Sequence, residues 1–166
     1  MEVVYSWFAN TLGQYISKEA VVFIVSLLPI LECRGGLIVA AMLKVDIIKA
    51  IPLAVIGNLL PIPFILLFIK KIFKWLKNFN WSRGIVEKLE NRALNKGDAM
   101  KSGEFFGLLF FVGIPLPGTG AWTGSLIASL LEIDTKKAVL AEFLGVLLAT
   151  LIMGFFSYGL LGRIIA

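Results

Sequence analysis

Four long apolar runs dominate the hydrophobic pattern of the chain, at residues 20–43, 47–69, 105–131 and 138–161. Each is long enough for the roughly 20 residues that a helix needs to cross a bilayer. Prolines and glycines interrupt the first and third runs near their middles, in the stretches LPILECRGG and IPLPGTGAWTG. The pattern predicts an all-α integral membrane protein with two broken apolar segments and two longer helices.

The broken runs have two interpretations. The arm from Ala20 to Leu28 spans about 13 Å of helix, which reaches only the middle of a hydrocarbon core about 30 Å thick. The first interpretation is a pair of re-entrant helical hairpins, at 20–43 and 105–131, each followed by a transmembrane helix, at 47–69 and 138–161. The second is a kinked helix that spans the membrane fully. Broken backbone at membrane depth has to be buried in protein or line a wet cavity.

The two halves of the chain can be aligned in one register. It pairs Phe23 with Phe111, Pro29 with Pro117, Gly36 with Gly124, Gly57 with Gly145, and the Asp-x-x-Lys-Ala segments that begin at Asp46 and Asp134. With re-entrant hairpins, a single crossing between the halves places them in opposite orientations, which is an inverted repeat. The predicted domains are a first repeat at 19–69 and a second at 104–166. Both aspartates are predicted to be helix N-caps.

Two further segments lie outside the repeats. Residues 1–18 carry apolar side chains near helical spacing and no basic signal-peptide region, which predicts an interfacial helix, with a partly inserted helix as the alternative. Residues 70–103 mix lysines and arginines with aromatic residues, which predicts an amphipathic cytoplasmic linker; a plain solvated connector is the alternative. Membrane topology thus explains the net charge of +5 and favours membrane lipids, rather than nucleic acid, as partners.

The composition excludes several classes of chemistry. The chain has 58% hydrophobic residues and a mean hydropathy of +0.90, far above a soluble domain. One cysteine and no histidine leave no disulfide, no usual transition-metal ligand set and no histidine general base. The phosphate-binding pattern GxxxxGK[ST] does not occur. We therefore expect a protein that is not an enzyme and binds neither a metal nor a cofactor.

A charge pair, Glu32 and Arg34, lies in the apolar centre of the first broken run. A charge near the bilayer middle costs at least about 2.5 to 3.5 kcal/mol, so it usually marks a pathway or a binding site. The planar guanidinium of Arg34 suits phosphate or carboxylate, and backbone N–H groups near Gly35 and Gly36 would add to this anion site. Glu32 either balances Arg34 or takes up a proton. The alternative is a static pair that only holds the hairpin tip together.

The second broken run offers uncharged groups. Its bare backbone, hydroxyls and indole would suit close approach to a ligand or to the first hairpin; the candidate residues are Pro117, Gly118, Thr119, Gly120, Trp122 and Thr123. Glu142 is a second candidate for proton coupling besides Glu32, unless its side chain snorkels to the cytoplasmic interface. Asn58, with Pro61 and Pro63 close behind it, is a polar and broken point of the middle helix.

Several motifs resemble those of a known family. LPILECRGG, GNLLPIPF and FVGIPLPGTGAWTG are similar to motifs of bacterial and archaeal small multidrug export proteins, and the resemblance covers nearly the whole chain. It implies a multi-pass protein of a prokaryotic plasma membrane. More distantly, the two hairpins and the amphipathic connector resemble the DedA superfamily, which is implicated in lipid and polyprenyl-phosphate translocation. By that resemblance Glu32 takes the acidic hairpin position, whereas the arginines of the second DedA hairpin are missing from residues 115–124.

Three functional hypotheses follow. The favoured one is a membrane transporter for an anionic amphiphile such as a lipid-linked (polyprenyl) phosphate, with proton coupling through Glu32. The second is proton-coupled export of cationic drugs, against which the positive charge of Arg34 argues. The third is a structural or assembly protein of the membrane. Because so few crossings hardly enclose a pathway, we also expect a homodimer.

Overall fold

Two units make up the computed structural model, which describes residues 3, 6, 10–11, 15–97 and 103–160. Residues 1–60 and 146–166 form the first unit, and residues 61–145 form the second. The regular structure of the described residues is helical, as the hydrophobic pattern predicts. The interfacial helix expected at 1–18 falls largely outside the described residues.

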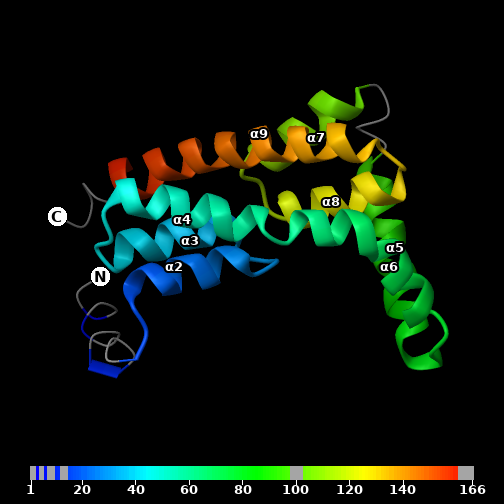
Figure 1. Ribbon diagram of the computed structural model, residues 1–166, viewed down its shortest axis with the longest axis horizontal. Coiled ribbons are helices and arrows are strands. Elements are labelled where there is room, and N and C mark those ends of the chain that lie inside the picture. The colour runs from blue at the N-terminus through cyan, green and yellow to red at the C-terminus, as the bar shows by residue number, and fades with distance from the viewer. Residues whose placement is uncertain (1–2, 4–5, 7–9, 12–14, 98–102, 161–166) are drawn as a thin grey trace. The chain divides into compact units, whose positions relative to one another are not determined.

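Helices α2 (Lys18–Leu27), α3 (Glu32–Met42) and α4 (Ile47–Leu59) pack side by side in the first unit (Figure 1). The Ser17 side chain caps α2 by accepting a hydrogen bond from the Ala20 N–H. Pro29 disfavours helical backbone at Leu28, which is extended and ends α2. Since α2 and α3 pack against each other, the chain reverses direction between them, and the single kinked helix considered for residues 20–43 does not form.

Two glycines bring α3 and α4 close to α2. A Cβ atom at Gly36 would lie 1.8 Å from Ser26 Oγ, and one at Gly57 would lie 2.7 Å from the Phe23 carbonyl oxygen. Small residues allow such close packing of helices in membranes, where burial from water does not drive association. The glycines are therefore required by the packing of the first hairpin.

A left-handed turn joins α3 to α4. Lys44 has a φ of 55°, and the Val45 N–H donates to the Ala40 carbonyl at 2.9 Å. This bond satisfies a carbonyl that the end of α3 would otherwise leave unpaired. Asp46 then caps α4, because its carboxylate accepts a hydrogen bond of 2.7 Å from the Ile48 N–H.

The second unit contains the same turn at the corresponding residues. Glu132 has a φ of 59°, and the Ile133 N–H donates to the Ala128 carbonyl at 3.0 Å. The Asp134 carboxylate accepts from the Lys137 N–H at 3.1 Å. Both predicted aspartate caps are confirmed.

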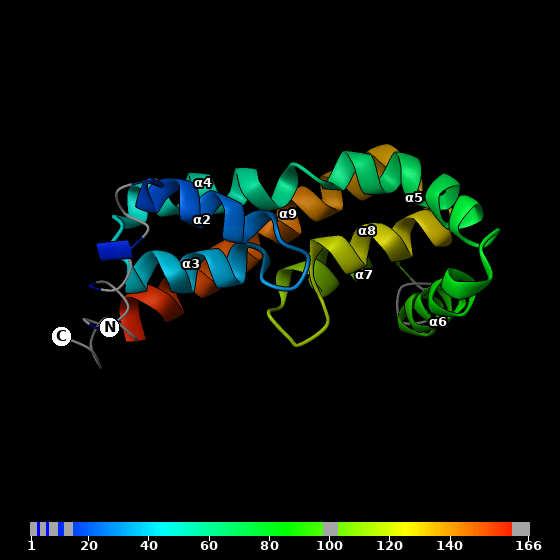
Figure 2. The ribbon, with the colours of Figure 1, turned by 90° about the horizontal axis from the view of Figure 1, so that it is seen from below.

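Helix α8 lies at the centre of the second unit, where it packs against α5, α6 and α7. Figure 2 shows the wide loop that joins α7 to α8. The helix bounds are α5 (Ile62–Leu76), α6 (Asn80–Gly97), α7 (Glu104–Gly113) and α8 (Ala121–Leu130). Helix α9 (Thr135–Gly154) begins in this unit; its last part and the π-helical segment η2 (Phe155–Leu160) belong to the first unit.

Two glycines also hold α7 in the second unit. A Cβ atom at Gly124 would lie 2.8 Å from Val112 Cγ2, and one at Gly145 would lie 2.8 Å from the Leu109 carbonyl oxygen. The sequence register aligns Gly124 with Gly36 and Gly145 with Gly57. The same mode of packing therefore occurs in both units.

In α2 and α7, the helices that precede the two hairpin loops, the residues that match in the structure differ from those that the sequence register pairs. Ser26 packs on Gly36 as Val112 packs on Gly124. Likewise, Phe23 packs on Gly57 as Leu109 packs on Gly145. The register pairs Phe23 with Phe111 instead, and this pairing is wrong. The loop of the second hairpin is longer than that of the first, and the extra residues shift the arm.

The helix expected at 47–69 consists of two helices. Residues 60–61 interrupt it, because Pro61 has no N–H to donate and begins a new helical segment. Helix α5 continues to Leu76, into the segment expected to begin the linker. Among the described residues, the stretches Ile47–Leu76 and Thr135–Gly159 are long and apolar enough to cross a membrane, with hydropathies of 2.2 and 2.3.

An exposed ion pair joins α5 to the turn before α9. Lys70 Nζ lies 2.8 Å from Glu132 Oε1, and this ammonium lowers the pKa of the Glu132 carboxyl. Exposed pairs contribute little to stability. Glu132 is therefore a useful control position for carboxylate substitutions.

We expect Gly145→Ala to lower the free energy of unfolding by about 1–3 kcal/mol, because the new methyl group meets a backbone carbonyl that moves only if α7 moves. The melting temperature of the purified protein in mild detergent measures this effect. Gly84→Ala in α6 is the matched control, since no atom lies within 4 Å of its Cβ position. It should be neutral or stabilising by up to about 1 kcal/mol. Equal melting temperatures for the two variants would contradict the close packing of α7.

Candidate functional site

Glu32 lies at the tip of the first hairpin, where α3 begins. Its side chain is 4% exposed, and its φ is 52°. Left-handed backbone costs a residue with a side chain about 1–2 kcal/mol, and burial of a carboxylate adds to that cost. The first turn of a helix favours an acidic side chain, but it requires neither the burial of that side chain nor left-handed backbone.

The second hairpin has a glycine at the corresponding position. Gly120, which the sequence register aligns with Glu32, has a φ of 134° and precedes the first residue of α8. Glycine adopts such backbone without steric cost. The two hairpins thus share positive φ at this position, and only the first places a carboxylate there.

Arg34 and two glycines follow Glu32 in the first turn of α3. Arg34 is partly exposed, and both charged residues take part in polar or electrostatic interactions. A Cβ atom at Gly35 would lie 2.7 Å from Leu31 Cβ, and Gly36 packs on α2. Packing therefore accounts for both glycines, whereas no packing requirement accounts for the charges.

Three polar side chains from three helices meet beside the tip. Cys33 of α3 lies within hydrogen-bonding reach of Thr150 of α9 and of Asn58 of α4. Each of the three side chains is 1% exposed. No protein group forms a hydrogen bond of good geometry with the Asn58 amide or the Thr150 hydroxyl. The sequence singles out Asn58, but it contains no signal for Thr150, because a hydroxyl in an apolar helix usually bonds to its own backbone.

The tip of the second hairpin contains a tight turn at Pro117 and Gly118. Gly118 has a φ of 76° and follows the proline, and the Thr119 N–H donates to the Leu116 carbonyl at 3.2 Å. Proline and then glycine at the two central positions are typical of a type II turn. The Thr119 hydroxyl lies 2.9 Å from the Leu116 carbonyl oxygen and 3.0 Å from that of Ile114. Turn geometry thus accounts for these three candidate residues.

The remaining candidates of the second unit lie on α8 and α9. Trp122 and Thr123 are partly exposed in the first turn of α8. Glu142 is fully buried, and its Oε2 accepts a hydrogen bond of 2.7 Å from the Ser125 hydroxyl. The alternative in which Glu142 snorkels to the interface is therefore wrong, and its carboxyl group lies inside the unit.

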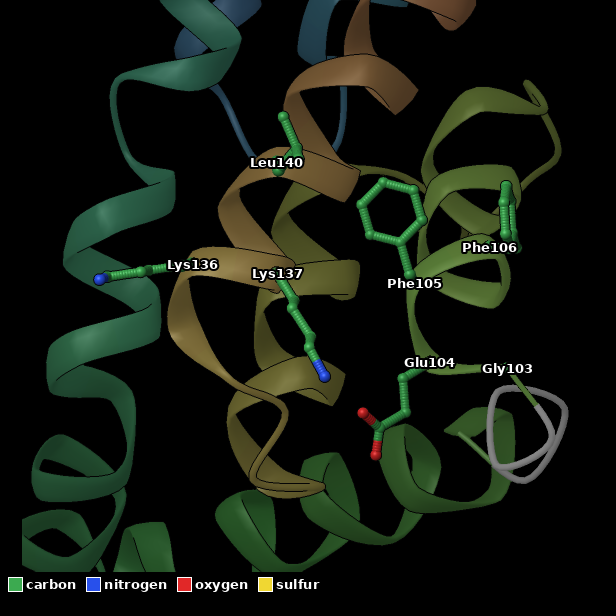
Figure 3. A pocket seen from close by; sticks show the side chains of 7 residues that line it. All are labelled: Gly103, Glu104, Phe105, Phe106, Lys136, Lys137 and Leu140. Atoms are coloured by element: carbon green, nitrogen blue, oxygen red, sulfur yellow. The ribbon is translucent and has the colours of Figure 1, made fainter.

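An open groove of about 510 Å³ lies by the first turns of α7 and α9 (Figure 3). In Figure 3 the Lys137 and Glu104 side chains extend toward the same side of the groove. Lysines beside apolar and aromatic side chains are typical of surfaces that contact lipid headgroups. The lining residues, none of them a predicted site residue, are Gly103, Glu104, Phe105, Phe106, Lys136, Lys137 and Leu140.

The surface of the two long apolar stretches is itself apolar. Ile56 is 54% exposed, Phe64 62% and Leu151 67%. Large apolar side chains exposed along helices of this length suit contact with lipid. A model of the family described as "Putative small multi-drug export protein" matches residues 32–152. The chain belongs to this family.

Membership in the small multi-drug export family agrees with the resemblance expected from the motifs. The matched range begins at Glu32 and includes Arg34, Asn58, Glu142 and Thr150. The family description and the two candidate spans support a membrane protein that takes part in transport. Searches of curated proteins and of solved structures found no match, so the DedA likeness stays a prediction. Among the described residues, no group of histidine, cysteine, aspartate or glutamate side chains is placed to hold a metal ion.

Proposed function

We propose that this protein is a transporter of the prokaryotic plasma membrane that moves an anionic amphiphile, such as a lipid-linked phosphate, past the tip of the first hairpin. The observation that carries the proposal is the buried carboxylate of Glu32 on left-handed backbone. Strain of this kind persists where surrounding structure maintains it, and it is concentrated at functional sites. Glu32 would take up and release a proton as the substrate passes.

Arg34 supports an anionic substrate. Its guanidinium carries five donors in a plane that matches phosphate or carboxylate oxygens, and it keeps its charge at physiological pH. It lies on the same helical turn as Glu32 and is partly exposed. An anion held by Arg34 would therefore come close to a carboxylate whose protonation favours its binding.

The proposal includes an inverted repeat of re-entrant hairpins, for which features common to the two units are the support. The two units share the left-handed turn before an aspartate cap, the two glycines packed on the first arm, and positive φ at the tip. Internal repeats with broken helices near the bilayer midplane are a common architecture of secondary transporters. A topology experiment with a C-terminal reporter tests this architecture, which requires that end of the chain to lie outside the cytoplasm.

A second candidate function is proton-coupled export of small drugs, which the family description favours. Glu32 would then bind a proton and a cationic drug alternately. The neighbouring positive charge of Arg34 opposes binding of a cation, and for this reason the anionic substrate ranks first. The two functions predict opposite results for Arg34→Gln, which weakens transport of an anion and strengthens transport of a cation.

The test is transbilayer movement of a labelled polyprenyl phosphate in proteoliposomes, with and without a proton gradient. We expect movement by the native protein and a loss of about 100-fold in Glu32→Gln, the size that follows from losing about 3 kcal/mol of a charged interaction. Glu132→Gln is the matched control, because Glu132 is also a glutamate at positive φ but its side chain is 81% exposed. That variant should retain native activity.

Three results would overturn the proposal. If native protein moves a quaternary ammonium dye and no polyprenyl phosphate, the export of cationic drugs is the function. If Glu32→Gln loses abundance in step with activity, the carboxylate stabilises the membrane protein and has no transport role. Equal activity in Glu32→Gln and the native protein would remove Glu32 from the mechanism.

A further inference from the structure

We propose that Cys33, Asn58 and Thr150 line a recess that binds water beside Glu32, and that this recess forms part of the transport path. The inference rests on the proposed function, to which it adds the groups that hydrate the carboxylate. Water is the ligand that fits, because the recess combines the donor and acceptor of an amide with a hydroxyl that does both.

The first argument is the cost of the cluster without a ligand. The Asn58 side chain presents a carbonyl oxygen and an NH₂ group, and neither forms a hydrogen bond of good geometry with the protein. The Thr150 hydroxyl is in the same situation. Buried polar groups without partners are rare, and each one requires an explanation such as a water molecule or another ligand.

The second argument is that the groups converge. They come from α3, α4 and the part of α9 that belongs to the first unit. The Cys33 thiol lies close to both the Thr150 hydroxyl and the Asn58 amide, so Cys33 connects the other two groups. A thiol is only a weak donor and acceptor, so it satisfies neither neighbour fully.

The third argument is the break in the helix directly after α4. Pro61 has no N–H, so the Gly57 carbonyl lacks the helical donor that residue 61 would normally supply. Asn58 follows Gly57 directly, and Cys33 follows Glu32 directly. Unwound backbone at membrane depth is tolerated where it is buried in protein or lines a water-filled cavity. A hydrated recess would meet that condition next to the buried carboxylate.

The chain carries its own reporter for this recess. Cys33 is its single cysteine. A thiol reacts with a charged methanethiosulfonate through its thiolate, so labelling requires that both water and the reagent reach Cys33, as they would along an open transport path. The thiolate attacks the sulfenyl sulfur, a mixed disulfide forms, methanesulfinate leaves, and the thiol proton passes to water.

The experiment measures the rate of Cys33 labelling in proteoliposomes by intact mass. The reagent is a membrane-impermeant, quaternary ammonium methanethiosulfonate. We expect labelling of the native protein, although the thiol is only 1% exposed. Denatured protein gives the full extent of reaction, and Cys33→Ser gives the background.

Matched variants identify the side-chain groups that bind water in the recess. Thr150→Val keeps the shape of the side chain and removes the hydroxyl, whereas Thr150→Ser keeps the hydroxyl. We expect labelling to slow by about tenfold or more in Thr150→Val and in Asn58→Leu, and to stay near the native rate in Thr150→Ser. Melting temperatures in detergent show that each variant is folded.

Labelling at the background rate in folded native protein would overturn the recess as part of the transport path, as would equal rates in Thr150→Val and Thr150→Ser. Neither result depends on knowing the substrate. Labelling without polyprenyl phosphate movement would leave the recess standing and refute the proposed function. Movement of polyprenyl phosphate without labelling of Cys33 would support the proposed function and refute the recess.

Discussion

Gly36→Ala should destabilise the first hairpin by about 3 kcal/mol, the upper part of the range for overpacking a tight interior. The new methyl carbon would lie 1.8 Å from Ser26 Oγ, a separation that no two atoms in non-bonded contact reach. The hydroxyl cannot easily turn away, because it donates a hydrogen bond of 2.7 Å to the Val22 carbonyl and is fully buried. The melting temperature in mild detergent and the yield of folded protein measure the loss.

A second substitution tests the cause of that loss. In Gly36→Ala combined with Ser26→Ala, the nearest remaining atoms are the Cβ of residue 26 at 3.1 Å and the Val22 carbonyl oxygen at 3.2 Å. These contacts are tight but tolerable, so the double variant should recover more than half of the lost stability. Ser26→Ala alone should cost about 1 kcal/mol or less, since its bond is to a carbonyl of its own helix. A double variant no more stable than Gly36→Ala would show that the two helices are not packed through these residues.

Substitutions at Glu32 should separate stability from activity. Glu32→Ala and Glu32→Gly both remove the carboxylate, so both should lose about 100-fold in transport. Only glycine relieves the strain of a side chain at a φ of 52°. The glycine variant should therefore be more stable than the alanine variant by about 1 kcal/mol, which differential scanning of the two proteins in the same detergent measures.

The second hairpin provides the reverse control. Gly120 has a φ of 134° and a ψ of −178°, a region essentially restricted to glycine. Gly120→Ala should thus destabilise the protein by about 1–3 kcal/mol.

If Glu32→Gly is less stable than Glu32→Ala, the backbone at the tip of the first hairpin is not strained, and the argument that Glu32 is retained for function fails.

Much of the candidate site could be predicted from single residues. Glu32 and Arg34 stand out because a charge inside an apolar run is expensive and therefore informative. Asp46 and Asp134 are recognisable as caps, because an N-cap depends on the residues of one helical turn. For Pro117 and Gly118 the sequence suggests a ligand, whereas local turn geometry is sufficient to explain them.

Other parts of the site depend on residues far apart in the chain. Thr150 joins Cys33 and Asn58 only because the last part of α9 belongs to the same unit as α3 and α4. The hydrogen bond between Ser125 and Glu142 likewise connects two helices. No local pattern distinguishes these hydroxyls from others in apolar helices, which commonly bond to their own backbone.

By itself, the sequence determined that this is a helical membrane protein of an export family, with broken apolar segments, a charged first tip and aspartate-capped helices. These properties follow from hydrophobic length, from backbone chemistry within a few residues, and from motifs. Only the tertiary structure decided that residues 20–43 form a hairpin, that Ser26 and Val112 occupy matching positions, and that Glu142 is buried. The physical reason is that packing depends on which distant surfaces approach closely enough to exclude a single methyl group.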